Sequence, residues 1–180
     1  MKCLFFLKNI AISLIIVLAL YSCKHEYKKP KQVVLNQDTV DQKLMNINKI
    51  LVANESEQIE AYIKRYNWEM NTTGSGLRYL IYEKGNGSQT KANSKIKINY
   101  RTSLLNGVTV YNSSFDGVKT FVIGKAEVEK GLEEGILLLK VGDKAKFIIP
   151  SHLAFGLLGD QKKIPKKATL VYDVELLEVK

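Results

Sequence analysis

The amino-acid sequence predicts an α+β fold in which a twisted antiparallel β-sheet wraps around one short α-helix, preceded by an N-terminal helical extension. Apolar and polar residues alternate in several short segments of the second half of the chain, as they do in strands. One amphipathic segment interrupts these strands and has the length of a helix that crosses the concave face of a curved sheet. Helical spacing of apolar residues marks the region before the strands, so we expect a helical arm in front of one domain.

Residues 1–22 have the pattern of a cleaved export signal. Lys2 and Lys8 supply a positive start, and the apolar run that follows is too short to span a bilayer comfortably. The segment ends in Leu-Tyr-Ser-Cys, which resembles the lipobox of bacterial lipoproteins, whose cysteine becomes the lipidated first residue of the mature chain. The resemblance implies a membrane-anchored lipoprotein of the cell envelope, lipidated at Cys23 and facing the periplasm. An uncleaved signal anchor is the alternative.

Charge and cysteine content follow from this cleavage. Residues 1–22 carry two lysines and no acidic residue, so the net charge falls from +9 to +7 in the mature chain. Nucleic acid is not expected as a partner outside the cytoplasm, and we interpret the charge as favouring anionic lipid headgroups or acidic polypeptides. Cys3 leaves with the signal and Cys23 would carry the lipid, which leaves no pair for a disulfide. Stability is therefore expected to come from an ordinary hydrophobic core.

Two further regions precede the main domain. Residues 23–37 are Lys-rich and lack apolar periodicity, which predicts a flexible tether. Residues 38–90 are predicted to hold a helical extension and a leading strand, because apolar residues recur at helical spacing within 44–51 and within 59–66. Asn54, which acidic residues follow, has the pattern of an N-cap, so we expect two helices or one interrupted helix. These helices either pack on the domain or form a dimerising or partner-binding arm.

Strands are predicted through the second half of the chain. The clearest spans residues 94–104, where alternation is that of a half-buried antiparallel strand. Asn106 and Gly107 then predict a hairpin turn. A single helix is predicted between residues 128 and 139, where four apolar residues recur at helical spacing. Further strands are predicted at residues 77–82, 120–123, 144–149 and 170–177.

The sequence lacks the usual motifs for catalysis by a metal, a nucleotide or an activated nucleophile. Its two histidines, His25 and His152, are far apart and have no metal-ligand spacing. No phosphate-binding loop, dinucleotide glycine motif or nucleophile elbow occurs. Glu133 and Glu134 are adjacent on the predicted helix and diverge in direction, so we interpret them as a solvated face. Any chemistry is therefore expected in a hydrophobic pocket, with no cofactor and no metal.

Several segments taken together resemble the FKBP-type peptidyl-prolyl cis-trans isomerase domain. They occur in the order and with the spacing of that family, and we expect residues 91–180 to form the domain. The lipobox and the helical arm extend the resemblance to the gliding-motility-associated FKBP-type lipoproteins of the Bacteroidetes. The segments are Tyr100 and residues 107–114, 121–124, 131–135, 141–145, 154–156, 164–165 and 168–176.

The resemblance implies rotation of the peptide bond that precedes proline in polypeptide clients, and binding of macrolide ligands in the same pocket. Amide resonance makes this rotation slow, with a barrier of roughly 18–20 kcal/mol. A dry aromatic pocket lowers the barrier when it strips water from the amide and holds the chain in a turn. By the same resemblance, the backbone N–H of Glu129 donates to the substrate carbonyl. The residues carried over to the pocket are Tyr100, Tyr111, Asn112, Phe121, Val128, Glu129, Leu132, Phe155, Ile164 and Tyr172.

Five pocket positions depart from the family pattern. Asn112 stands where aspartate is usual, and Phe155 stands where tyrosine is usual. Leu132 replaces an aromatic residue, Glu129 replaces an aliphatic one, and Lys119 falls near a position that is often aromatic. Two function classes remain open. One is an isomerase that assists the folding of exported proteins at the cell envelope, and the other is a weakly catalytic or non-catalytic proline-binding chaperone or assembly factor for a gliding-motility or secretion complex.

Overall fold

The computed structural model of the chain describes the backbone of residues 37–180 and the side chains of residues 41–180. The predicted signal peptide and Cys23 lie outside the described residues. The predicted tether also lies outside them, except for its last residue, Gln37, which begins the first described helix. Within the described part of the chain, no helix combines the length and apolar character needed to cross a membrane.

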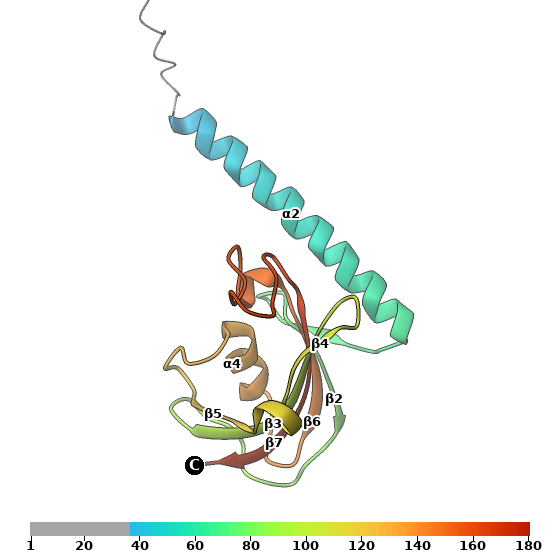
Figure 1. Cartoon of the computed structure of the whole chain (residues 1–180), viewed down its shortest axis with the longest axis vertical. Helices are drawn as coiled ribbons and strands as arrows, with labels where there is room; N and C mark the ends of the chain where they lie inside the picture. The colour runs from blue at the N-terminus through green and yellow to red at the C-terminus, as the bar shows by residue number, and fades with distance from the viewer. Residues whose placement is uncertain (1–36) are drawn as a thin grey trace, which may run out of the picture. The chain divides into compact units, whose positions relative to one another are not determined.

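A seven-stranded antiparallel sheet forms most of the domain (Figure 1). The strands follow the order β1-β2-β6-β7-β3-β4, and β5 also pairs with β3. Each predicted strand is present, with ends shifted by at most two residues. The strands are β1 (Asn71–Thr72), β2 (Arg78–Glu83), β3 (Lys95–Leu104), β4 (Thr109–Asn112), β5 (Lys119–Val122), β6 (Lys144–Ile149) and β7 (Leu170–Val179).

The turn between β3 and β4 is the hairpin that the sequence predicts. Gly107 has a φ of 87°, which favours glycine because a Cβ would strain this backbone. Its N–H donates to the carbonyl of Leu104 at 2.9 Å, and this bond closes the turn. The hairpin carries Tyr111 back along β3, where it lies opposite Thr102.

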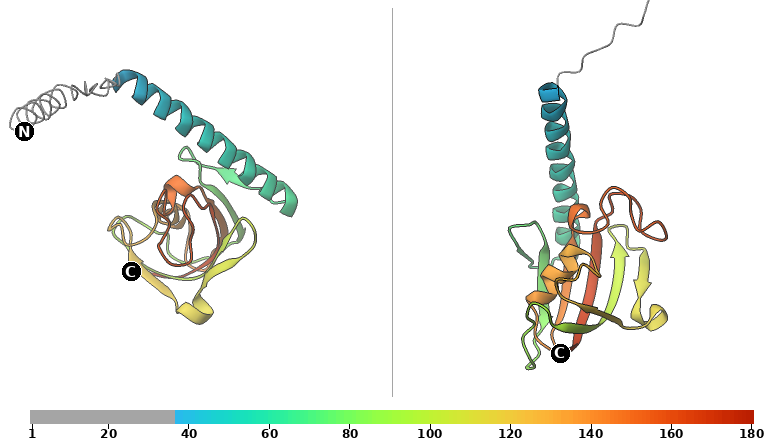
Figure 2. Two further views of the ribbon diagram at one scale, coloured as in Figure 1. Left: turned by 45° about the horizontal axis from the view of Figure 1, so that its top comes forward. Right: turned by 90° about the vertical axis from the view of Figure 1, so that its left-hand side faces the viewer.

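Helix α4 (Lys130–Leu137) lies on the concave side of the sheet, as predicted (Figures 1 and 2). Leu132 and Ile136 are fully buried, and so is Leu139, just beyond the helix end. These side chains join one core with residues of β3, β6 and β7. Gly131 and Gly135 allow the helix to approach the sheet closely, because a Cβ at Gly131 would lie 2.3 Å from Cγ2 of Ile149.

The prediction that a single helix interrupts the strands is wrong in detail, since two short helical turns are also present. Helix α3 (Ser113–Asp116) follows β4, and a 3-10 turn, η1 (Ser151–Leu153), follows β6. Each is only one turn long, so neither leaves an apolar periodicity in the sequence. The turn η1 opens the β6–β7 connection, residues 150–169, which contributes to the candidate site below.

The region before the sheet is one continuous helix, α2 (Gln37–Tyr66), so the predicted break at Asn54 is wrong. Glu55, directly after Asn54, binds the domain and does not begin a new helix. The carboxylate of Glu55 accepts hydrogen bonds from the N–H and Oγ of Ser151, at 2.7 and 2.9 Å, and from Oγ1 of Thr169. Glu60 forms an ion pair of 2.9 Å with Arg78 of β2.

Helix α2 packs on the domain only through its second half. Ile59 and Tyr62 are buried in a second cluster with Ile148 of β6 and Val171 of β7. The prediction that the helical region packs on the domain is therefore confirmed for its second stretch, residues 59–66. The apolar side chains that mark the first stretch are 40–60% exposed; they are Leu44, Ile47, Ile50 and Leu51.

Candidate active site

The apolar side chains predicted to form a pocket belong to one cluster. Five of them, Tyr100, Phe121, Leu132, Ile164 and Tyr172, are at least nine-tenths buried. The other three pack against the same core while keeping part of their surface exposed; they are Tyr111, Val128 and Phe155. The sheet, α4 and the β6–β7 connection therefore bring together residues that lie far apart in the sequence.

A cavity of about 330 Å³ opens onto this cluster. Four of the predicted residues line it. Tyr100, Tyr111 and Phe155 give the cavity its aromatic surface, and Glu129 gives it a carboxylate. The complete lining is Tyr100, Tyr111, Lys119, Glu129, Phe155, Asp160 and Lys162.

Asp160 fixes one wall of the cavity. Its Oδ1 accepts hydrogen bonds from the backbone N–H groups of Lys162, at 2.9 Å, and Ile164, at 2.7 Å. Its Oδ2 accepts a hydrogen bond from the hydroxyl of Tyr111. Asp160 was not among the site residues predicted from the sequence. The available signal is the pair Gly159-Asp160, because aspartate often bonds to backbone N–H groups a few residues ahead in a turn.

These hydrogen bonds shift the pKa values of both side chains. The bond to Asp160, followed by burial, raises the pKa of Tyr111 to about 12. Burial alone would raise the pKa of Asp160, but the hydrogen bonds from Tyr111 and from the backbone outweigh it and lower that pKa. Tyr111 is therefore a neutral donor and Asp160 a charged acceptor at neutral pH.

Glu129 and Tyr172 form a buried polar pair at the base of the site. The Tyr172 hydroxyl donates to Oε1 of Glu129 at 2.9 Å, and the two residues are 1% and 8% exposed. Burial first, and then the charge of Glu129, raise the pKa of Tyr172 well above its usual value. A carboxylate thus occupies a wall that an aliphatic side chain would keep apolar.

Two lysines lie over aromatic rings at the rim. Lys119 places Nζ 4.9 Å from the ring centre of Tyr100 and 5.9 Å from that of Tyr172. Lys163 places Nζ 4.7 Å from the ring centre of Tyr111. Cations at these distances are attracted to the faces of aromatic rings. Lys119 therefore covers part of the aromatic surface with its own stem and charge.

Asn112 does not line the cavity. It directly precedes α3, and its Oδ1 accepts a hydrogen bond of 3.0 Å from the N–H of Ser114. This is a helix N-cap, for which asparagine is a favoured residue. Its assignment as a polar group of the pocket remains a prediction.

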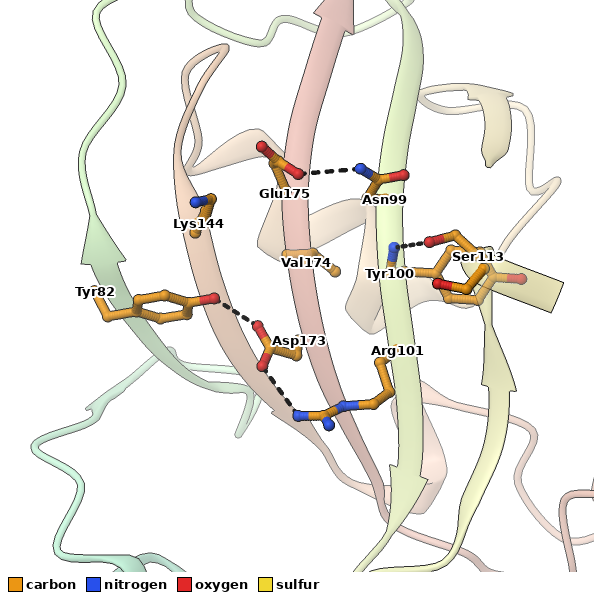
Figure 3. A pocket seen from close by; sticks show the side chains of 10 residues that line it. Tyr82, Asn99, Tyr100, Arg101, Ser113, Lys144, Asp173, Val174 and Glu175 are labelled. Atoms are coloured by element: carbon orange, nitrogen blue, oxygen red, sulfur yellow. Dashed lines mark hydrogen bonds and ion pairs between the residues drawn. The ribbon is translucent and has the colours of Figure 1, made fainter. Parts of the chain in front are cut away.

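A second cavity of about 370 Å³ lies against the face of the sheet that points away from α4 (Figure 3). Several of its polar side chains are hydrogen-bonded to one another. Asp173 accepts hydrogen bonds from the Tyr82 hydroxyl at 2.7 Å and from Arg101 at 3.4 Å, while Asn99 donates to Glu175 at 3.0 Å. This cavity therefore offers few free groups. Within residues 41–180, no group of three His, Cys, Asp or Glu side chains is placed to hold a metal ion.

Known proteins are similar to this chain in both sequence and fold. A Haemophilus influenzae protein named as a probable FKBP-type peptidyl-prolyl cis-trans isomerase is 30% identical over 87% of this chain and 67% of its own length. FK506-binding protein 2 of Dictyostelium discoideum is 42% identical over 51% of this chain and 69% of its length. The crystal structure of FkpA from Escherichia coli matches with a TM-score of 0.63 and 31% identity, over 82% of this chain and 74% of that one.

A family model fixes the position of the shared domain. The model of the FKBP-type peptidyl-prolyl cis-trans isomerases matches residues 86–177, which is about half of the chain and contains every lining residue of the aromatic cavity. The chain spans 67% of the H. influenzae protein, and 60% and 49% of two further bacterial relatives. This chain belongs to the FKBP-type peptidyl-prolyl cis-trans isomerase family.

Proposed function

We propose that this protein is a peptidyl-prolyl cis-trans isomerase that assists the folding of exported proteins. The observation that carries the proposal is the aromatic cavity, which lies within the family domain and is lined by Tyr100, Tyr111 and Phe155. Its volume suits a proline ring and part of the flanking chain. The clients are proline-containing polypeptides, and no cofactor is required because the reaction makes and breaks no covalent bond.

The chain's own residues account for the catalytic effect. The aromatic walls remove water from the prolyl amide, which disfavours its charge-separated resonance form and weakens the resistance to rotation. The backbone N–H of Glu129, directly before α4, is the proposed donor to the substrate carbonyl. Among the described residues, no hydrogen bond uses this N–H. Asp160 holds the Tyr111 hydroxyl and the N–H of Ile164, so the cavity is prepared before the substrate binds.

An isomerisation assay tests the proposal directly. With a Leu-Pro tetrapeptide, the full mature chain is expected to accelerate cis-to-trans conversion with a kcat/KM above about 10⁴ M⁻¹s⁻¹, measured against the uncatalysed rate. It should also accelerate the refolding of a protein whose slow step is prolyl isomerisation. A chain that binds the peptide without accelerating its rotation would contradict the proposal.

That contrary result would favour the alternative, a proline-binding chaperone or assembly factor for a gliding-motility or secretion complex. Two departures from the family's usual pocket residues support the alternative. The side-chain oxygen of Asn112 is occupied by Ser114, and Phe155 presents no hydroxyl to the cavity. The named relatives favour the isomerase.

We also propose that the protein is anchored at the cell envelope through a lipid on Cys23 and faces the periplasm. The lipobox pattern of residues 20–23 supports this proposal. Cys23→Ser is expected to abolish labelling of the protein by a radioactive fatty acid, because the acyl chain would have no attachment site. Cys3→Ser is the matched control and should retain the label. Labelling that persists in Cys23→Ser would refute the anchor, and digestion of the domain by protease added to intact cells would refute the periplasmic orientation.

A further inference from the structure

Positively charged side chains gather at the aromatic cavity. Lys119 and Lys162 are two of its lining residues. A third lysine, Lys163, places Nζ 4.7 Å from the ring centre of Tyr111, which also lines the cavity. Lys119 belongs to β5, whereas the other two lysines belong to the β6–β7 connection. Two segments that lie far apart in the sequence therefore bring three cations to one cavity.

These ammonium groups are at most weakly paired within the protein. Among the ion pairs of residues 41–180, none includes Lys119 or Lys162. Lys163 approaches Asp116 only to 3.9 Å, and 54% of its side chain is exposed. One exposed lysine attracts an anion weakly in water, but several around one cavity add their fields. The cavity therefore has cations available for a charged ligand.

The two carboxylates of the same cavity are already engaged by the protein. Glu129 is only 8% exposed, and its Oε1 accepts the hydroxyl proton of Tyr172. Asp160 accepts hydrogen bonds from the hydroxyl of Tyr111 and from two backbone N–H groups. Such bonds stabilise a carboxylate and use its acceptor sites. The charged groups that remain available to a ligand are therefore the ammonium groups.

We propose that Lys119 and Lys162 are specificity-determining residues, which favour polypeptides that carry Asp or Glu beside the proline. This inference rests on the proposed function and names the substrate class of the same cavity. When a proline ring occupies the aromatic cavity, the residues bonded to it lie at the cavity mouth, within reach of long lysine side chains. The attraction acts on encounter and binding, so the selection affects KM and the dissociation constant and leaves kcat unchanged.

Three peptides with blocked ends test the selection in the full mature chain. They are Ala-Glu-Pro-Glu-Ala, Ala-Gln-Pro-Gln-Ala and Ala-Lys-Pro-Lys-Ala, and exchange NMR measures kcat/KM for each. At about 10 mM NaCl, kcat/KM for the Glu peptide is expected to exceed that for the Lys peptide about tenfold, with the Gln peptide between them. At about 1 M NaCl, where the screening length falls to about 3 Å, the three values should agree within about twofold.

Two double variants assign the selection to these lysines. Lys119→Gln with Lys162→Gln should reduce the ratio of the Glu peptide to the Lys peptide to about twofold, and Lys119→Glu with Lys162→Glu should invert it. A ratio between two peptides cancels any general effect of a variant on activity. Lys91→Glu, at an exposed lysine outside the cavity lining, is the matched control and should keep the wild-type ratio.

Three results would overturn the proposal. They are a wild-type ratio near one, a ratio that persists unchanged in 1 M salt, and a ratio that the double glutamine variant retains. Failure of the proposed isomerase is a separate outcome, because it appears as no acceleration with any of the three peptides. Dissociation constants from calorimetry would still report the ratio in that case, so the preference is measured whether or not the chain catalyses rotation.

Discussion

Replacing Asp160 with alanine is expected to lower kcat/KM for prolyl isomerisation by about 10- to 100-fold. The variant loses the acceptor for the Tyr111 hydroxyl and for the N–H groups of Lys162 and Ile164. A displacement of about 1 Å in such a wall is enough to cost up to about two orders of magnitude in rate. The core itself is untouched, so the thermal midpoint should fall only modestly. Steady-state assays beside a thermal melt separate these two effects.

The pH dependence gives an internal check on this result. Asp160 has a lowered pKa in the folded protein, so its contribution is complete above the ordinary carboxyl pKa of about 4 and is lost as pH falls through the folded value. The difference between wild type and Asp160→Ala in peptide affinity should therefore shrink below about pH 4. Glu57→Ala is the matched control and should resemble wild type at every pH. A difference that persists unchanged at low pH would mean that the carboxylate does not hold the wall.

Gly131→Ala is expected to destabilise the domain by about 1–3 kcal/mol, although glycine to alanine within a helix ordinarily stabilises by about 1 kcal/mol. The sign is reversed because the new Cβ would lie 2.3 Å from Cγ2 of Ile149 and 3.1 Å from Cβ of Leu153. Ile149 is fully buried and Leu153 packs against the same core, so the helix must move outward. Chemical denaturation measures the change in the free energy of unfolding.

Gly74 offers a control of the same chemistry. A Cβ added there meets no heavy atom within 4 Å, and its φ is not positive. Gly74→Ala should therefore change the free energy of unfolding by no more than about 0.5 kcal/mol. Gly135→Ala should behave like Gly131→Ala, since its Cβ would lie 2.7 Å from the ring of Phe147. A stabilised Gly131→Ala would show that α4 does not need close contact with the sheet.

The sheet was predictable because its signal is local. Each strand buries one face, so alternation along β3 and β7 marks both their length and the side chains that reach the core. The aromatic residues of the site followed from the family resemblance, which relies on order and spacing along the whole domain. The packing of the second half of α2 could also be predicted from the sequence, because Ile59 and Tyr62 recur at helical spacing and both are buried.

The remaining features depend on long-range partners that leave no pattern in the sequence. Asn54 and the acidic residues after it have the composition of a helix start, but Glu55 bonds to Ser151 and Thr169 and the helix continues. Asp160 lies in a loop without apolar periodicity, and its role depends on the hydroxyl of Tyr111 from β4. A carboxylate's partners are set by the tertiary fold, so composition alone could not identify either role.

The contacts of Glu55 have a thermodynamic consequence for the cavity. One carboxylate on α2 holds Ser151 and Thr169, which lie close to the two ends of the β6–β7 connection, and that connection carries Phe155, Asp160 and Ile164. Ordering this part of α2 and ordering the cavity wall are therefore coupled events. An interaction that orders the helix therefore strengthens ligand binding in the cavity. A bound ligand in turn orders the helix by the same free energy, because linkage between two equilibria is reciprocal.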